Sequence, residues 1–487
     1  MELLRPGLVF VGLLLLAWGS ESLTLSSRLI HRFSEEAREI WSARSGEGAV
    51  GWLSRGSEDY YRALVGRDLL RQKNKLGVRY QVVFPSRAAE LWVSGTTSAG
   101  ELHYTWVDIG TPNVSFLVAL DAGSDLFWVP CDCIQCAALS GGRNGLPRAL
   151  HLSVNQLQKP KQPCPYFVDY YSENTSSSGL LVEDTLYLAS SDENAFMGAS
   201  VIIGCGSRQS GGYLDGIAPD GLLGLGLGDV SVPTILAKEG LVRDSFSLCF
   251  QEDDSGRILF GDQGISGQRS TPFVSVEGKY PTYIIEVEGW CIGSQCLRQT
   301  ATRALVDCGS SFTYLPSSVF KVVVAEFDRQ MNRSSITYEE SPFQYCYRAS
   351  SLEMPTIPRV ALTLAVNQSF VVNNPLFLFY GKQGQREAFC LALQPSDDPH
   401  VTIGQNFMTG YKVVFDRELM RLAWSPSSHC GDPASSRRVP RTPPPRDRPE
   451  NPLPTDEARG PPVAPPSTPP SPGALPRPPR RLHRPTR

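Results

Sequence analysis

Long hydrophobic runs are scarce in this sequence of 487 residues: after residue 22, no segment reaches the about 18 consecutive apolar residues of a transmembrane helix. A dominant charge is missing as well, because 46 basic side chains nearly balance 49 acidic ones and leave a net charge of −3. That balance argues against a dedicated nucleic-acid-binding protein. A hydrophobic content of 41% excludes a wholly disordered chain, and the length predicts two to four folding units.

The first 22 residues have the layout of a secretory signal peptide. Arg5 precedes an apolar run of 11 residues, Leu8–Trp18, and small residues follow up to Ser22. The run is too short to cross a bilayer comfortably, and a buried core helix is the less favoured alternative. We therefore expect residues 1–22 to direct the chain into the secretory pathway and to be removed.

The chain has 12 cysteines, and an oxidising compartment favours their pairing into disulfides. They are Cys131, Cys133, Cys136, Cys164, Cys205, Cys249, Cys291, Cys296, Cys308, Cys346, Cys390 and Cys430. The cluster Cys131–Cys136 could instead bind zinc, but no histidine or second cysteine pair stands at a supporting spacing, so no metal is expected. Four N-glycosylation sequons agree with export, and they begin at Asn113, Asn174, Asn332 and Asn367.

Composition divides the rest of the chain into three parts. Residues 23–95 contain no cysteine, carry 12 basic and 8 acidic side chains, and show amphipathic helical spacing at Leu29–Phe33 and Tyr60–Val65. From residue 96 to residue 430, short β-rich runs such as Val114–Leu120 alternate with turn residues. This pattern predicts an all-β region, and its net charge is −12.

The last part, residues 431–487, holds 19 of the 39 prolines, 11 arginines and no aromatic residue. Such a composition cannot bury enough apolar surface to offset the chain entropy lost on folding. We expect a disordered, partly polyproline-like tail with a net charge of +6. A solvated spacer is favoured here over a ligand for aromatic grooves.

The β-rich part contains a short motif that occurs twice. Asp121–Ser124 follows one apolar run, and Asp307–Ser310 follows another, 186 residues later. Each copy has a partner that ends in glycine: Leu222–Gly224 ends 103 residues after the first aspartate, and Thr402–Gly404 ends 97 residues after the second. Two strand-led copies with partners at matched spacing indicate two similar lobes rather than two unrelated surface turns.

Two similar lobes can bring two aspartate loops together at a pseudo-twofold axis. Carboxylates about 3 Å apart share one proton, and their pKa values split. The ionised member can take a proton from water while the protonated member polarises a peptide carbonyl, with no cofactor, metal or covalent intermediate. Gly123 and Gly309 let the backbones approach, and Ser124 and Ser310 can orient the carboxylates by hydrogen bonds.

These motifs and their surroundings resemble the pepsin family of aspartic endopeptidases, above all its plant members in the nepenthesin and xylanase-inhibitor-like branch. The resemblance covers about residues 23–430. It implies a bilobal all-β fold, a cleft for an extended peptide, and peptide hydrolysis at acid pH. The stretches that carry it are Leu102–Pro112, Asp121–Cys131, Gly216–Gly226, Val306–Pro316 and Ile403–Tyr411.

The resemblance also implies an order of domains. A basic prosegment can lie over an acidic cleft until acidification protonates the carboxylates. Lys73 and Lys75 are candidate contacts for the catalytic pair, with a solvated charge cluster as the favoured alternative for either one. The expected parts are a signal peptide at 1–22, a prosegment at 23–95, an N-terminal lobe at 96–270, a C-terminal lobe at 271–430 and a disordered tail at 431–487.

By this resemblance, Asp121 and Asp307 match the catalytic pair. In the family, a hairpin flap closes over the substrate and its tyrosine bonds to a tryptophan, which Trp128 matches here. The segment Asn174–Gly179 resembles the tip of the flap. Its tyrosine is then either Tyr170 or Tyr171, and we favour Tyr170, with a packed sheet aromatic as the alternative.

The resemblance implies that Cys346 pairs with Cys390 and Cys205 with Cys430, and that Cys308 is a free thiol. The pairing of the seven remaining cysteines, at 131, 133, 136, 164, 249, 291 and 296, stays open. Relatives have a longer segment with more cysteines between Cys136 and Cys164, whereas residues 139–158 are short and do not match.

Two departures concern the dyad itself. The family has threonine after the first aspartate and serine or threonine after the second, and these hydroxyls brace the two loops. This chain has Ala122 and Cys308 instead, so we predict a working but slow enzyme.

The rival hypothesis is a non-catalytic member of the fold that acts as an inhibitor or binding protein, and the presence of both aspartates argues against it. A serine or cysteine protease is not favoured, because none of the six histidines lies in a triad motif.

The resemblance finally suggests where the protein acts and with what. Its partners would be polypeptide substrates in an extended conformation, with no nucleic acid, and we expect a monomer. Close relatives often end in a hydrophobic tail that signals a lipid anchor, but this chain ends in Arg480–Arg487 without one. We therefore expect delivery to the cell exterior, the cell wall or a vacuole without an anchor or a transmembrane segment.

Overall fold

The computed structural model describes most of the chain between residues 23 and 426. The described residues are 23–45, 52–54, 56–73, 81–83, 91–93, 103–111, 113–137, 164–170, 175–190, 196–214, 218–251, 255–275, 282–338, 341–349, 356–373, 375–380 and 385–426. Among them, no helix has the length and apolar character needed to span a membrane. Several predictions fall outside them: the signal peptide, the tail, residues 139–158, Lys75, Tyr171, Asn174 and Cys430.

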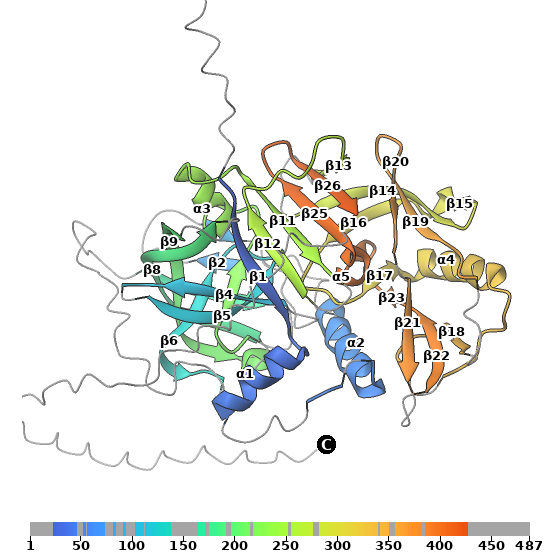
Figure 1. Cartoon of the computed structure of the whole chain (residues 1–487), viewed down its shortest axis with the longest axis horizontal. Coiled ribbons are helices and arrows are strands. Elements are labelled where there is room, and N and C mark those ends of the chain that lie inside the picture. The colour runs from blue at the N-terminus through green and yellow to red at the C-terminus, as the bar shows by residue number, and fades with distance from the viewer. Residues whose placement is uncertain are drawn as a thin grey trace, which may run out of the picture. The chain divides into compact units, whose positions relative to one another are not determined.

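Strands dominate the described residues, which confirms the all-β prediction (Figure 1). The strands of the first half are β1 (Leu25–His31), β2 (Gln81–Val83), β3 (Leu91–Val93), β4 (His103–Ile109), β5 (Val114–Asp121), β6 (Trp128–Gln135), β7 (Cys164–Tyr170), β8 (Thr175–Ser190), β9 (Phe196–Ser210), β10 (Leu222–Gly224), β11 (Ser245–Phe250), β12 (Ser255–Phe260) and β13 (Arg269–Pro272).

The second half is built in the same way, from short strands between turns. They are β14 (Ile284–Ile292), β15 (Gln295–Leu297), β16 (Thr302–Val306), β17 (Thr313–Pro316), β18 (Cys346–Arg348), β19 (Val360–Leu364), β20 (Gln368–Val371), β21 (Leu376–Tyr380), β22 (Arg386–Leu391), β23 (Leu393–Ser396), β24 (Val401–Ile403), β25 (Tyr411–Asp416) and β26 (Arg421–Pro426).

Helices are few among the described residues. The longest in the second half, α4, buries Phe320, Val323, Val324 and Phe327, and this three- and four-residue spacing places them on one face. The helices are α1 (Glu35–Ser45), α2 (Glu58–Lys73), α3 (Val232–Lys238), α4 (Ser317–Gln330) and α5 (Gln405–Met408), with 3₁₀ turns at Gly211–Tyr213 and Arg298–Thr300.

The largest sheet joins strands from both halves of the chain. Its order is β13-β26-β25-β11-β12-β1-β4-β5-β10-β6-β9-β8-β7-β2-β3. The last two strands of the chain enter it where β25 pairs antiparallel with β11, with Phe415 opposite Phe246. In Figure 1 the orange β25 and β26 accordingly lie beside the green β11 and β12. The two halves therefore share one continuous hydrogen-bonded layer.

Two further sheets belong to the second half. One has the order β20-β19-β14-β16-β24-β17-β23, with β15 paired to β14. The other has the order β18-β22-β21. In the first of these, β16 and β24 run parallel with Val306 opposite Ile403, which repeats the parallel pairing of β5 with β10 in the large sheet. This repeat positions the two aspartate loops.

The helical prediction for Leu29–Phe33 is wrong, whereas Tyr60–Val65 lies in α2 as predicted. Residues Leu25–His31 form strand β1, which is an interior strand between β12 and β4. Leu29 and Ile30 are both buried there, so opposite faces of the strand are covered. Two adjacent apolar residues occur in an amphipathic helix, but they also occur in a strand that is buried on both faces. Here the pairing of β1 with its neighbours selects the strand.

The disulfides correct one expected pairing. Cys346 bonds to Cys390, the pairing that the resemblance implied, and the two face each other across β18 and β22. Cys205 bonds to Cys131 rather than to Cys430, because β6 and β9 are parallel neighbours and bring the two Cα atoms within 5.2 Å. Cys249 is also disulfide-bonded, and the other described disulfides are Cys133–Cys136 and Cys291–Cys296.

Candidate active site

The first aspartate loop begins where β5 ends. Asp121 is the last residue of β5, and its carbonyl accepts a hydrogen bond from the Leu225 N–H at 2.8 Å. The Gly123 N–H donates to Asp121 Oδ1 at 2.9 Å, and the Ser124 hydroxyl donates to Asp121 Oδ2. A Cβ atom on Gly224 would lie 2.3 Å from the Asp125 carbonyl carbon, so the partner strand needs glycine there.

The second loop repeats the two hydrogen bonds to the carboxylate. Asp307 follows β16 directly, and its N–H donates to the Ile403 carbonyl at 3.0 Å. The Gly309 N–H donates to Asp307 Oδ1 at 2.9 Å, and the Ser310 hydroxyl donates to Asp307 Oδ2 at 3.1 Å. A Cβ atom on Gly404 would lie 2.2 Å from the Phe312 carbonyl oxygen, which is the same close approach as in the first loop.

The two carboxylates thus have equivalent surroundings. Asp121 is 1% exposed and Asp307 is fully buried. A buried carboxylate is costly unless donors surround it, and each one here receives an N–H on one oxygen and an O–H on the other. These bonds fix the orientation of both carboxyl groups, which is what a reaction that needs two aligned acid–base groups requires.

The residues that follow each aspartate belong to the hydrophobic core. Ala122 is 1% exposed and Cys308 is 4% exposed, and both pack in the same buried cluster as Leu225 and Tyr283. Cys308 forms no disulfide. The positions at which the family has bracing hydroxyls are therefore occupied by buried side chains that carry no hydroxyl group.

The segment expected as the flap belongs to the hairpin of β7 and β8, and Thr175–Gly179, expected at its tip, are strand residues of β8. Tyr170 ends β7 and pairs with Thr175 of β8, but the side chains of Tyr170 and Tyr171 lie outside the described part of the chain. Trp128 is fully buried, and its ring contacts Tyr213 edge-on at a centroid distance of 5.0 Å. Sequence reasoning missed Tyr213, which no local pattern distinguishes. The partnership of Trp128 with a flap tyrosine stays a prediction.

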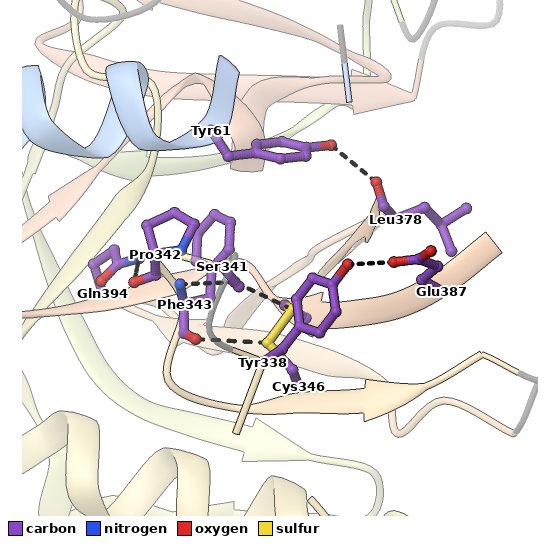
Figure 2. The surroundings of a disulfide bond; sticks show 10 residues. Tyr61, Tyr338, Ser341, Pro342, Phe343, Cys346, Leu378, Glu387 and Gln394 are labelled. Atoms are coloured by element: carbon purple, nitrogen blue, oxygen red, sulfur yellow. Dashed lines mark hydrogen bonds between the residues drawn. A yellow bond between two sulfur atoms is a disulfide. The ribbon is translucent and has the colours of Figure 1, made fainter. Parts of the chain in front are cut away.

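Helix α2 of the N-terminal segment packs on the second half of the molecule. The Tyr61 ring lies 4.7 Å from that of Phe379 and 5.1 Å from that of Phe377, and its hydroxyl donates to the Leu378 carbonyl at 3.4 Å. Figure 2 shows Tyr61 reaching from α2 toward Leu378, beside the disulfide of Cys346. Phe377 in turn contacts Phe312, so α2 lies one ring away from the residues that follow the Asp307 loop.

The described contact of α2 is aromatic and does not involve Lys73 at its C-terminal end. Lys73 and Lys75 are candidate contacts for the catalytic carboxylates, with a solvated charge cluster as the favoured alternative. The side chain of Lys73 and all of Lys75 lie outside the described residues, so the electrostatic contact is untested.

Two β-rich halves that each present a matching Asp-x-Gly-Ser loop define a pepsin-like protein of the aspartic protease type. Residues 103–262 match the family described as "Xylanase inhibitor N-terminal", and residues 283–426 match "Xylanase inhibitor C-terminal". The chain belongs to the plant pepsin-like aspartic protease family that carries these two domains. This confirms the family resemblance of the sequence motifs.

Two curated relatives from Arabidopsis thaliana are similar over most of their length. The chain is 46% identical to Aspartic proteinase-like protein 1 over 462 residues, which cover 89% of this chain and 86% of the relative. It is 38% identical to Aspartyl protease family protein 1 over 436 residues, which cover 84% of this chain and 82% of the relative. These names support membership of a protease family.

Solved structures confirm the fold. Conglutin gamma, a basic 7S globulin from lupine seeds, matches with a TM-score of 0.52 and 19% identity, and the match covers 71% of this chain and 95% of that structure. Basic 7S globulin from soybean matches with a TM-score of 0.51 and 18% identity, over 68% of this chain and 94% of that structure. At such low identity the likeness establishes the architecture alone.

Proposed function

We propose that this chain is an aspartic endopeptidase that hydrolyses peptide bonds at acid pH, with Asp121 and Asp307 as its catalytic pair. The observation that carries the proposal is the repeat of hydrogen bonds around the two carboxylates, from a glycine N–H and a serine hydroxyl in each loop. The two relatives that are named as an aspartic proteinase-like protein and an aspartyl protease family protein support the same class.

In the proposed reaction, the two carboxyl groups share one proton. The ionised aspartate removes a proton from water, and the resulting hydroxide attacks the peptide carbonyl while the protonated aspartate hydrogen-bonds the carbonyl oxygen. Proton transfer to the amide nitrogen then lets the C–N bond break, which yields a carboxylic acid and an amine. The glycine and serine donors keep both carboxyl groups oriented while protons move.

The decisive experiment compares the wild-type chain with Asp121→Asn. Casein hydrolysis between pH 3 and pH 5 is expected to fall by about 10³-fold in the variant, because an amide cannot serve as a general base. Inhibition by a peptide that mimics the tetrahedral transition state should disappear with it. Asp229→Asn, an exchange of the same type at an exposed side chain, serves as the matched control and should keep full activity.

A non-catalytic role in binding is the second candidate, favoured by one observation. The residues after both aspartates, Ala122 and Cys308, are buried without a hydroxyl group. If the wild-type chain and Asp121→Asn are equally inactive between pH 3 and pH 5, and neither binds the transition-state mimic, the protease proposal fails and a binding role replaces it.

The N-terminal segment completes the proposal as a prosegment within residues 23–95. Its strand β1 pairs with the first half of the molecule and its helix α2 packs on the second half. Such contacts suit a segment that restrains the enzyme before removal.

We also propose Tyr170 as the flap tyrosine, polypeptide substrates, a monomeric state and a secretory route to the cell exterior, cell wall or vacuole. Asn113, Asn332 and Asn367 are exposed, which supports glycosylation there.

A further inference from the structure

One tyrosine connects the two aspartate loops. Tyr283 precedes β14 and is fully buried. Its hydroxyl donates to the Leu225 carbonyl at 2.6 Å, and its own carbonyl accepts a hydrogen bond from the Val306 N–H at 2.9 Å. Leu225 follows the partner strand of the first loop, and Val306 precedes Asp307, so the two bonds end at different loops.

The hydrogen bonds continue to the aspartates. The Leu225 N–H donates to the Asp121 carbonyl at 2.8 Å, while Val306 is joined to Asp307 by a peptide bond. A continuous path therefore runs from Asp307 through Tyr283 to Asp121. One hydrogen bond links Tyr283 to the Asp307 side, and two hydrogen bonds link it to Asp121. The path is continuous, so a shift of the tyrosine would move the two aspartates relative to each other.

Aromatic neighbours fix the tyrosine ring. Phe415 lies 4.8 Å away, Phe273 lies 5.2 Å away and Phe246 lies 6.0 Å away, measured between ring centroids. They come from β25, from the residue after β13 and from β11. A phenol held by rings on three segments has little rotational freedom, so its hydroxyl can define a distance between two loops.

The hydroxyl remains a donor at every pH at which the enzyme would act. Burial raises the pKa of Tyr283 above that of an ordinary tyrosine; the positive charge of Arg417 opposes the shift, and Asp125 adds to it. Cys308 also adds to the shift, which places the phenol within electrostatic reach of residues from both aspartate loops.

We propose that Tyr283 is the positioning residue of the aspartate pair: its phenol and its carbonyl hold the two loops in register, where Ala122 and Cys308 supply no bracing hydroxyls. This inference rests on the proposed protease function, since it assigns Tyr283 a role in that site. The residue touches neither substrate nor the carboxylates, and it acts through Leu225 and Val306.

The test compares Tyr283→Phe with Tyr411→Phe. Tyr411 also donates its hydroxyl to a backbone carbonyl at 2.6 Å, that of Val371, and is likewise buried, but it contacts neither aspartate loop through that bond. Both variants lose one hydroxyl and keep the ring. Any general effect of deleting a buried tyrosine hydroxyl should appear in both.

The expected result for Tyr283→Phe is a fall in kcat of about tenfold at a nearly unchanged KM, because alignment of the carboxyl groups is lost rather than substrate contact. Tyr411→Phe should keep the kcat of the wild-type chain. Ala122→Thr, which adds a hydroxyl beside Asp121, should recover more kcat in the Tyr283→Phe background than in the wild-type chain. Equal losses in the two tyrosine variants, or an unchanged kcat in Tyr283→Phe, would overturn the proposal.

A second measurement does not need activity. Cys308 is buried and not in a disulfide, whereas Cys164 is an exposed thiol. Alkylation with iodoacetamide, followed by peptide mass spectrometry, should label Cys164 equally fast in all variants and label Cys308 about tenfold faster in Tyr283→Phe alone. If no variant hydrolyses casein, the protease proposal fails, but the alkylation rate still tests the positioning role of Tyr283. An unchanged rate at Cys308 in Tyr283→Phe refutes that role.

Discussion

At the scale of single residues, the site combines strict repetition with two exceptions. The aspartates, glycines and serines of the two loops make the same hydrogen bonds. Ala122 and Cys308 stand at equivalent positions and are both buried, but neither side chain is a strong hydrogen-bonding group. The carboxyl groups therefore keep their local donors, while no hydroxyl group from these two positions contributes to the connection between the loops.

Restoring the hydroxyls should strengthen that connection. In the double variant Ala122→Thr with Cys308→Ser, we expect kcat to rise about five- to tenfold, since each neutral hydrogen bond contributes about 1 kcal/mol. Steady-state kinetics at pH 4 measure the change. Cys164→Ser makes the same chemical exchange at an exposed site and is the control. A rate that stays equal to or falls below that of the wild-type chain would count against bracing by hydroxyls at these positions.

At the scale of elements, the N-terminal segment is attached through aromatic packing. Tyr60, Tyr61, Leu64 and Val65 of α2 are buried in one cluster with rings of the second half, including Phe343 and Phe379. Tyr61 contributes most of the described ring contacts. Most of the stability of a helix in a protein comes from tertiary packing, so we expect these contacts to stabilise the 16 residues of α2.

Removing the Tyr61 ring should release α2. Tyr61→Ala is expected to cost about 3 kcal/mol of packing and to raise hydrogen exchange throughout α2, while β1 remains protected. Tyr61→Phe is the matched control, because it removes the hydroxyl group, with its 3.4 Å bond to Leu378, and keeps the ring. Hydrogen exchange with mass spectrometry distinguishes the two. Equal protection of α2 in Tyr61→Ala and the wild-type chain would show that the helix is held by other contacts.

Helix α4 offers a test of pH dependence. Hydrogen bonds from Arg329 and then from Gln330 lower the pKa of Glu326 from 4.5 to about 2. A pKa that is lower in the folded state than in the unfolded state stabilises the fold above pH 4.5, and this contribution is lost as the pH falls toward 2. Because the Arg329 side chain is 66% exposed, solvent screening limits the contribution to less than about 1 kcal/mol.

Urea unfolding of Glu326→Gln should therefore show a small loss of stability at pH 6 that disappears near pH 2. Glu239→Gln, at an exposed position after α3, provides the comparison. A difference between Glu326→Gln and the wild-type chain that is the same at pH 6 and pH 2 would contradict the assignment to the carboxylate charge.

At the scale of the whole molecule, charge is distributed unevenly along the chain. Residues 96–430 carry a net charge of −12, whereas residues 23–95 carry +4 and residues 431–487 carry +6. Protonation of carboxylates at acid pH reduces the repulsion within the acidic part and its attraction for basic segments. The overall value of −3 describes none of these parts. The acidic part is consistent with the activity at acid pH that we propose.

The sequence alone predicted the all-β class and located both aspartate loops. The loops could be found because the same short motif occurs twice, at Asp121–Ser124 and at Asp307–Ser310. It failed where a residue's surroundings come from distant strands. The spacing around Leu29 predicts a helix, whereas pairing with the distant strands β12 and β4 makes this segment a strand. The predicted partner of Cys205 is wrong, because the local sequences of β6 and β9 do not show that the two strands are parallel neighbours. Tyr283 was missed for the same reason.

The position of β1 in the large sheet has a consequence for maturation. Leu25–Ile30 pair with β12 on one side, and Leu29–His31 pair with β4 on the other. A peptide-bond cut between α2 and β4 would leave this strand bound between two neighbours, as a separate polypeptide in an otherwise unbroken layer. The cut molecule would then be one particle made of two chains, and the short peptide would leave only when another strand replaced it between β12 and β4.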